Sequence, residues 1–153
     1  MKKYEFTGET KQVELLFRTA TLHRIKAVAE FGVVKIGDIG GWIEKEENLS
    51  HEGNAWVCGD AKVYGNAEVY GNAKVFSISH VLVIGPIGSR NDFTTFFRDK
   101  DSEITVKCGC FLGKIDKFLE KVCETHGDSQ YAIVYRTAVE IAKQQIDLSE
   151  EKQ

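Results

Sequence analysis

Four copies of one hexapeptide follow each other between Gly53 and Phe76, and they read GNAWVC, GDAKVY, GNAEVY and GNAKVF. A period of six fits neither an amphipathic helix, with a period of about 3.6, nor the alternation of a simple strand. Self-similarity at this period is typical of a parallel β-helix, in which each repeat buries its apolar side chains against its neighbours. The repeat therefore predicts a coil of short strands at the centre of the chain.

Each position of the hexapeptide has its own chemistry. β-Branched valine suits a pleated, half-buried surface, and glycine tolerates the positive φ of a tight corner. The side chains expected inside the coil are Val57, Val63, Val69 and Val75, with Ala55, Ala61, Ala67 and Ala73 at the narrow corners. The side chains expected to point outward are Trp56, Lys62, Glu68 and Lys74.

This repeat resembles the hexapeptide-repeat, left-handed β-helix superfamily, which is best known for acyltransferases and also has carbonic-anhydrase-like and structural members. The resemblance is regular over 53–76 and extends less regularly from about Val33 to Leu82. It implies a mainly β fold: a short left-handed parallel β-helix with an N-terminal β cap and a C-terminal α+β module of a hairpin and two helices. The expected segments are 1–32 for the cap, 33–82 for the coil and 83–153 for the module.

The segments GDIGGWIEKEENLSHEGNAWV and GPIGSRNDFTTFF, with VKCGCFLGKIDKF further on, resemble parts of uncharacterised hexapeptide-repeat proteins of Firmicutes and their phages. By this resemblance we expect a homo-oligomer, with a trimer favoured because left-handed coils often associate side by side. The aromatic residues Tyr64, Tyr70 and Phe76 recur six apart and fit either coil packing or a subunit contact.

The N-terminal segment reads as strands at Tyr4–Thr7, Val13–Ala20 and Leu22–Ala29. After the coil, Ser77–Ile84 reads as a last coil strand and Gly85–Asp92 as a loop.

Two β-rich runs, Phe93–Arg98 and Glu103–Cys108, predict a hairpin. Helical periodicity begins after Gly109, with a first helix closed by His126-Gly127 and a second over Ser129–Asp147. Residues 148–153 are expected to fray.

The composition excludes several classes of protein. A net charge of −3 argues against bulk nucleic-acid binding, and no apolar run reaches the ~20 residues that span a bilayer. The N-terminus lacks the apolar stretch of a signal peptide, so we expect a cytoplasmic protein, in the host cytoplasm if it is phage-encoded. The four cysteines have no zinc spacing and are expected to be free thiols, so neither a metal nor a cofactor is predicted.

The best candidate for a binding site combines the loop at Gly85–Asp92 with the turn at Cys108–Cys110. Backbone N–H groups in glycine-rich turns hold anions, and an arginine offers a planar fork to phosphate or carboxylate. The predicted ligand-binding residues are Gly88, Ser89, Arg90, Asn91, Asp92, Thr94, Cys108, Gly109, Cys110, Tyr131 and Tyr135. The alternative is a structural turn in which Asn91 and Asp92 bond local backbone.

Catalytic residues are not predicted. A hexapeptide acyltransferase needs a histidine base, for which only His51 and His80 lie near the coil, and His80 is expected on the surface. Cys110 would be reactive at a helix N-terminus, although a buried thiol explains it as well, and Cys123 falls at a helix position expected to be buried.

The sequence therefore favours a non-catalytic binding protein in which an oligomeric scaffold presents a pocket for a small anionic, nucleotide-like ligand. A phage protein that sequesters nucleotide immune signals would fit this description by analogy. The alternatives are an acyltransferase-like enzyme and a structural or protein-binding coil.

Overall fold

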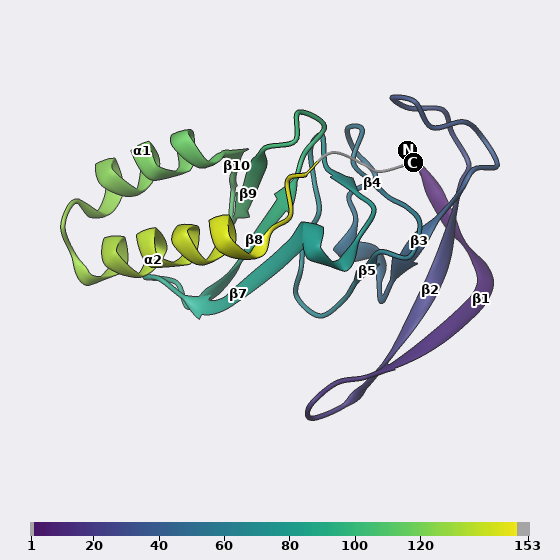
Figure 1. Cartoon of the computed structure of the whole chain (residues 1–153), viewed down its shortest axis with the longest axis horizontal. Coiled ribbons are helices and arrows are strands. Elements are labelled where there is room, and N and C mark those ends of the chain that lie inside the picture. Colours follow the sequence, from purple (N-terminus) through teal and green to yellow (C-terminus); the bar gives the residue numbers. More distant parts are fainter. Residues whose placement is uncertain (1, 150–153) are drawn as a thin grey trace.

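The computed structural model describes residues 2–149, so the predicted fraying of 150–153 lies outside the described residues. The strands of the first half are β1 (Tyr4–Glu14), β2 (Thr19–Ala27), β3 (Ile39–Ile43), β4 (Trp56–Val57), β5 (Lys62–Val63) and β6 (Lys74–Val75). The second half has β7 (Val81–Ile87), β8 (Asp92–Arg98), β9 (Ile104–Cys108) and β10 (Phe111–Lys114), followed by α1 (Ile115–His126) and α2 (Gln130–Gln145). Short 3₁₀ turns span Glu46–Asn48 and Ile78–His80. Figure 1 shows the two helices on one side of the β7–β10 sheet and the hexapeptide region on the other.

The chain is mainly β with two helices, but the expectation of a left-handed parallel β-helix is wrong. The β10-β9-β8-β7 sheet is wholly antiparallel, and β1-β2-β3 are antiparallel with only β5 added in parallel. Within residues 2–149, parallel pairing is otherwise limited to β4 with β6 and to a bridge between Leu49 and Val69. Four regular hexapeptides give each two-residue strand at most one stacked neighbour, so the long flanking strands supply most of the sheet structure.

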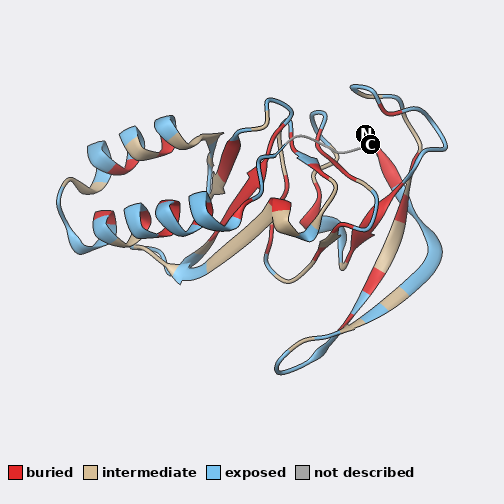
Figure 2. Ribbon diagram, viewed as in Figure 1, coloured by how far each residue is buried: buried red, intermediate tan, exposed pale blue. Residues whose placement is uncertain are grey.

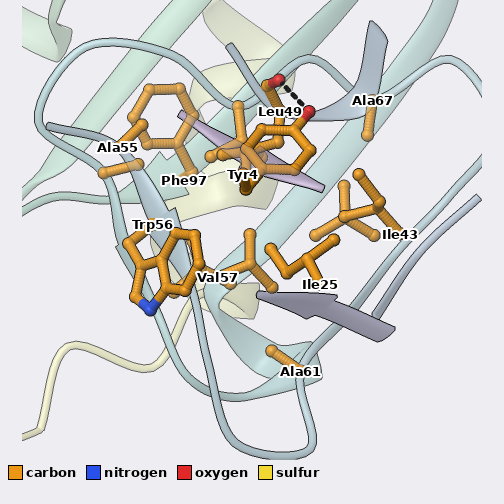
Figure 3. Packing of buried hydrophobic residues seen from close by; sticks show 14 of the residues in the cluster. Tyr4, Ile25, Ile43, Leu49, Ala55, Trp56, Val57, Ala61, Ala67 and Phe97 are labelled. Atoms are coloured by element: carbon orange, nitrogen blue, oxygen red, sulfur yellow. Dashed lines mark hydrogen bonds between the residues drawn. The ribbon is translucent and has the colours of Figure 1, made fainter. Parts of the chain in front are cut away.

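The chemistry of the hexapeptide positions is nevertheless confirmed inside this smaller arrangement. The four valines are at most 1% exposed, the four alanines are buried, and Gly53, Gly59, Gly65 and Gly71 all adopt positive φ. Trp56 is an exception, because it is buried edge-on against Phe31 and does not point to solvent. Figure 3 shows how Tyr4, Ile25 and Phe97 from other parts of the chain complete the core around these small residues.

Asn48 joins two levels of this core. Its side chain is fully buried, and its amide donates to the carbonyl oxygens of Gly65 (3.1 Å) and Ala67 (2.8 Å). Its carboxamide oxygen accepts from the backbone N–H of Lys45 at 3.0 Å. The side chain thus satisfies three backbone groups that the short strands leave without a partner.

The N-terminal strands differ from the prediction. Strand β1 is continuous through the polar Gly8–Lys11 stretch, whereas the centre of the predicted Val13–Ala20 strand forms the turn to β2. The resulting hairpin projects from the body with an exposed tip (Figure 2), where Leu16 and Phe17 are 87% and 93% exposed. Solvated polar side chains on both sides of a strand do not prevent pairing. Leu15 packs against the small core of Ala20, Leu22 and Trp42, but Leu16 and Phe17 remain exposed beyond it.

Glu44 ties this hairpin to the hexapeptide region. Its carboxylate accepts two hydrogen bonds from the Arg18 guanidinium, at 2.6 and 3.0 Å, and one from the backbone N–H of Gly65 at 2.8 Å. The hydrogen bonds from Arg18, followed by that from Gly65, lower the pKa of Glu44 from its ordinary 4.5 to about 2.

We expect Glu44→Gln to destabilise the chain in a pH-dependent way. A carboxyl with a lowered pKa contributes stability above its unfolded value, and this is lost as pH falls toward the folded value. The wild type should therefore exceed the variant by about 1 kcal/mol at neutral pH, since the pair is partly exposed and screened. The difference should shrink as pH falls from 4.5 toward about 2, as measured by urea unfolding. An equal difference throughout that range would show that the pair is not responsible.

The C-terminal region contains the predicted hairpin, as β8 and β9, and both predicted helices. The segment after the coil differs. Ser77–Ile84 is not a coil strand, and half of the predicted loop at 85–92 is strand, because β7 runs to Ile87 and β8 begins at Asp92, with a turn at 88–91 between them. Strand β10 was also not predicted. Pairing along the β8–β9 hairpin extends the sheet on both edges, which the composition of these short segments does not reveal.

The β7–β10 sheet has a hydrophobic core on each face. Phe96 and Val106 pack with α1 and α2, whereas the neighbouring Phe97 packs with the hexapeptide valines. Hydrogen bonds from the backbone N–H of Glu68 to Thr95 and of Lys100 to Asn72 join the sheet to the hexapeptide region. The predicted division at residues 32 and 82 remains a prediction.

Candidate functional site

A cavity of about 290 Å³ lies between the β7–β8 turn, the β9–β10 turn and the two helices. The residues that line it are Ser89, Arg90, Asp92, Cys108, Gly109, Cys110, Phe111, Phe118, Lys121, Val122, Thr125, His126 and Tyr135. The two turns predicted as a joint binding site are therefore neighbours in space.

The β7–β8 turn is fitted closely onto α2. Gly88 has φ +78°, and a Cβ atom there would lie 1.9 Å from the Tyr135 hydroxyl oxygen. The backbone N–H of Asn91 donates to Gly88 at 3.2 Å, and Asn91 itself has φ +50°. This packing leaves Ser89 and Arg90 exposed at the tip of the turn, on the cavity.

Tyr135 and Cys108 form the floor between the turns. Tyr135 is only 8% exposed, and Cys108 Sγ accepts a hydrogen bond from Thr94 Oγ1 at 3.3 Å. Burial raises the pKa of the Tyr135 hydroxyl, Cys108 and Asp92 act in the same direction, and the positive charge of Arg90 acts against them. Tyr135 is therefore a neutral hydroxyl at physiological pH.

Aromatic rings form one wall. Phe118 lies edge-on to Tyr135, with centroids 5.7 Å apart, and tilted to Phe111 at 5.4 Å. His126 stacks on Tyr135 with centroids 5.7 Å apart. The lining thus combines these aromatic rings with the cationic side chains of Arg90 and Lys121.

The predicted site residues divide into those on the cavity surface and those that support it. Ser89, Arg90, Asp92, Cys108, Gly109, Cys110 and Tyr135 line it. Gly88 and Asn91 shape the turn, and Thr94 is buried beneath Cys108. Tyr131 does not line the cavity. It lies in the first turn of α2, its side chain is 46% exposed, and its ring lies beside that of His126.

Sequence reasoning missed the contribution of α1. Phe118 and Val122 have the i, i+4 spacing of a core-facing apolar stripe, and Lys121 and Thr125 fall on the same helical face, three and seven residues after Phe118. Two polar residues within an apolar stripe were the available signal that this face borders a cavity.

The histidines and cysteines that were only alternatives for chemistry lie outside the cavity or in surroundings other than those expected. His51 accepts a hydrogen bond from the Lys3 N–H at 3.0 Å and stacks on Tyr4, and neither it nor His80 lines the cavity. His80 is buried, not on the surface, and accepts from the Phe76 N–H. Cys110 lies in the β9–β10 turn and not at a helix N-terminus, and Cys123 is exposed because it falls on the outer side of α1.

Within residues 2–149, neither helix has the length and apolar content needed to cross a membrane. No group of three or more His, Cys, Asp or Glu side chains in this part of the chain is arranged to hold a metal ion.

Comparison with known proteins gives a partial similarity. The chain is 34% identical over 61 residues to the uncharacterized acetyltransferase YdcK of Escherichia coli. The matched segment covers 37% of this chain and 19% of YdcK. The chain thus spans about a fifth of the length of the curated relative that it matches. No protein-family model matches. The similarity to YdcK gives loose support to a relationship with the hexapeptide-repeat superfamily.

Proposed function

We propose that the cavity binds a small anionic ligand with a planar ring, of the size and kind of a nucleotide, and that the protein acts by binding without catalysis. The observation that carries the proposal is that one cavity is lined both by Arg90 and Lys121 and by the aromatic residues Phe111, Phe118 and Tyr135. An aromatic wall accepts the faces of a base, and a guanidinium offers a planar fork to phosphate.

The remaining polar groups fit the same ligand. Ser89 and Thr125 supply hydroxyls, and Asp92 supplies an acceptor for an amino or hydroxyl group of the ligand. A single carboxylate on the lining is outnumbered by Arg90 and Lys121, so the local charge favours an anion.

The biological setting rests on resemblance. The likeness to proteins of Firmicutes and their phages supports a phage protein that sequesters a nucleotide signal of host immunity. We also propose that the chain works as a homo-oligomer, an expectation that rests only on the resemblance to the hexapeptide-repeat superfamily.

The test is calorimetric titration of the full chain with a panel of mononucleotides, cyclic nucleotides and dinucleotides. Charge-assisted hydrogen bonds contribute about 1.5–3 kcal/mol, so Arg90→Gln should weaken binding of the best ligand about 10- to 100-fold. Lys35→Gln is the matched control, because it removes one positive charge at an exposed side chain that does not line the cavity. Absence of binding to the wild type, or equal losses in the two variants, would contradict the proposal.

Acyl transfer is a second candidate, favoured only by the similarity to YdcK. The histidines expected to act as a base, His51 and His80, do not line the cavity. Turnover of acetyl-CoA that disappears in His51→Ala or His80→Ala would establish this candidate in place of the first.

A further inference from the structure

Two of the four cysteines share one turn and one cavity. Cys108 ends β9 and pairs with Phe111 of β10, so the two residues between them form the loop of this hairpin, and Cys110 is the second of the two. Both cysteines line the cavity described above. Cys58 packs against the hexapeptide core and Cys123 lies on the outer side of α1, so neither of them borders this cavity.

The loop of the hairpin brings the two thiols within reach of each other. Gly109, between them, has φ +56°, and a positive φ at the first position of a two-residue hairpin loop is typical of a type II′ turn. In such a tight turn the Cα atoms of residues two apart are separated by about 5.5 Å, within the range of about 4.4–6.8 Å found in disulfides. A disulfide between Cys108 and Cys110 is therefore compatible with the course of the backbone.

The two sulfur atoms differ in exposure. Cys108 packs against the core formed with α1 and α2, and its Sγ accepts the hydrogen bond from Thr94 Oγ1, whereas Cys110 is exposed. Arg90 and Lys121 belong to the same lining. Redox-sensing cysteines are generally accessible, lie in electropositive surroundings and have a second thiol beside them. Cys110 thus has the position of an attacking thiol, and Cys108 that of a resolving thiol.

We propose that Cys108 and Cys110 are a redox-active pair that hydrogen peroxide closes to a disulfide within the turn. The Cys110 thiolate attacks one peroxide oxygen, the O–O bond breaks, and a sulfenic acid and a first water result. The Cys108 thiolate then attacks the Cys110 sulfur, the S–S bond forms, the S–O bond breaks, and a second water leaves. One peroxide is reduced to two waters, which take up the two thiol protons, and two thiols are oxidised to one disulfide. Exposed disulfides are readily reduced by other thiols, so the modification is reversible.

Closure of the pair changes the ligand cavity, a consequence that rests on the proposed function. The new bond draws Cys108 Sγ away from Thr94, and Cys108 forms part of the floor beside Tyr135. We therefore expect the oxidised chain to bind its best nucleotide about tenfold more weakly, the effect of losing about one hydrogen bond.

The experiment is oxidation of the reduced full chain with a stoichiometric amount of hydrogen peroxide, followed by unfolding, alkylation with N-ethylmaleimide and peptide mass mapping. Peptides that contain Cys58 or Cys123 should carry the label. The peptide that contains Cys108 and Cys110 should be unlabelled and about 2 Da lighter than its reduced form. Treatment with dithiothreitol before alkylation should restore both labels. In Cys108→Ser the sulfenic acid on Cys110 has no thiol to condense with, so dimedone should capture it.

Cys110→Ser should abolish the disulfide. Cys123→Ser is the matched control, because it removes an exposed thiol outside the cavity and should leave formation of the disulfide unchanged. Far-ultraviolet circular dichroism verifies that each variant is folded. The proposal would be overturned by full labelling of both cysteines after oxidation, by further oxidation of Cys110 without a disulfide, or by equal losses of the disulfide in the two variants.

Titration of the reduced and the oxidised chain with the nucleotide panel separates the redox pair from the proposed function. A tenfold weaker affinity after oxidation supports regulation of the cavity by the pair. Equal affinities of the two forms would overturn this regulation, although the disulfide itself is established by mass. Absence of binding to the reduced chain would instead contradict the proposed function and leave the mass result as it stands.

Discussion

Phe97→Ala is expected to lower the free energy of unfolding by about 3–5 kcal/mol, the usual cost of deleting a fully buried phenylalanine. Phe97 is 0% exposed and contributes to the core around the hexapeptide valines from the opposite side, on β8. The hexapeptide side chains in this core are mostly valines and alanines, which are too short to fill the cavity left behind. Chemical denaturation measured by tryptophan fluorescence would give the change.

The matched control is Phe17→Ala, which deletes the same ring at a side chain that is 93% exposed. Its expected effect is within about 0.5 kcal/mol, as for most surface substitutions. Similar losses in the two variants would mean that the hairpin tip is covered in solution, or that Phe97 is not in the core.

Asn48→Ala is expected to cost on the order of 3 kcal/mol. The substitution leaves the carbonyls of Gly65 and Ala67 and the N–H of Lys45 without their partner, and an unsatisfied buried polar group costs about 1–3 kcal/mol. The same denaturation measurement applies.

Asn54→Ala, at an exposed asparagine of the first hexapeptide, serves as control and should change stability little. If Asn48→Ala matched this control, water would have to satisfy the three backbone groups in place of the amide.

The sequence predicted local chemistry better than it predicted architecture. The four repeat valines are buried, and Gly59, Gly65 and Gly71 have positive φ. Both properties follow from the size and flexibility of these residue types, so the repeat alone was sufficient to predict them. The fold class was wrong because it depends on how many levels stack and on what the long strands pair with. Such pairings join residues far apart in the chain, for example Thr10 with His23 and Asp99 with Ala73.

The candidate site shows the same division. Glycine, arginine and cysteine in two turns suggested a joint site, and both turns border one cavity. The part played by α1 was missed because Phe118 and Val122 fit a core stripe equally well, and their cavity-side contacts depend on where β10 places the helix. Tyr131 was wrongly predicted to bind the ligand, because the sequence places it on a helix but does not show which way its side chain points relative to the cavity.

Adjacent residues of β8 belong to different cores, Phe96 to the helical one and Phe97 to that of the hexapeptides. Strand β7 alternates in the same way, with Val81 and Val83 facing one core and Leu82 and Ile84 the other. An excised hexapeptide segment would lose one wall of its interior, and a grafted C-terminal segment would carry an uncovered apolar face into its new host. Recombination of this chain with other repeat proteins would therefore succeed only if the crossover preserved both sides of the sheet.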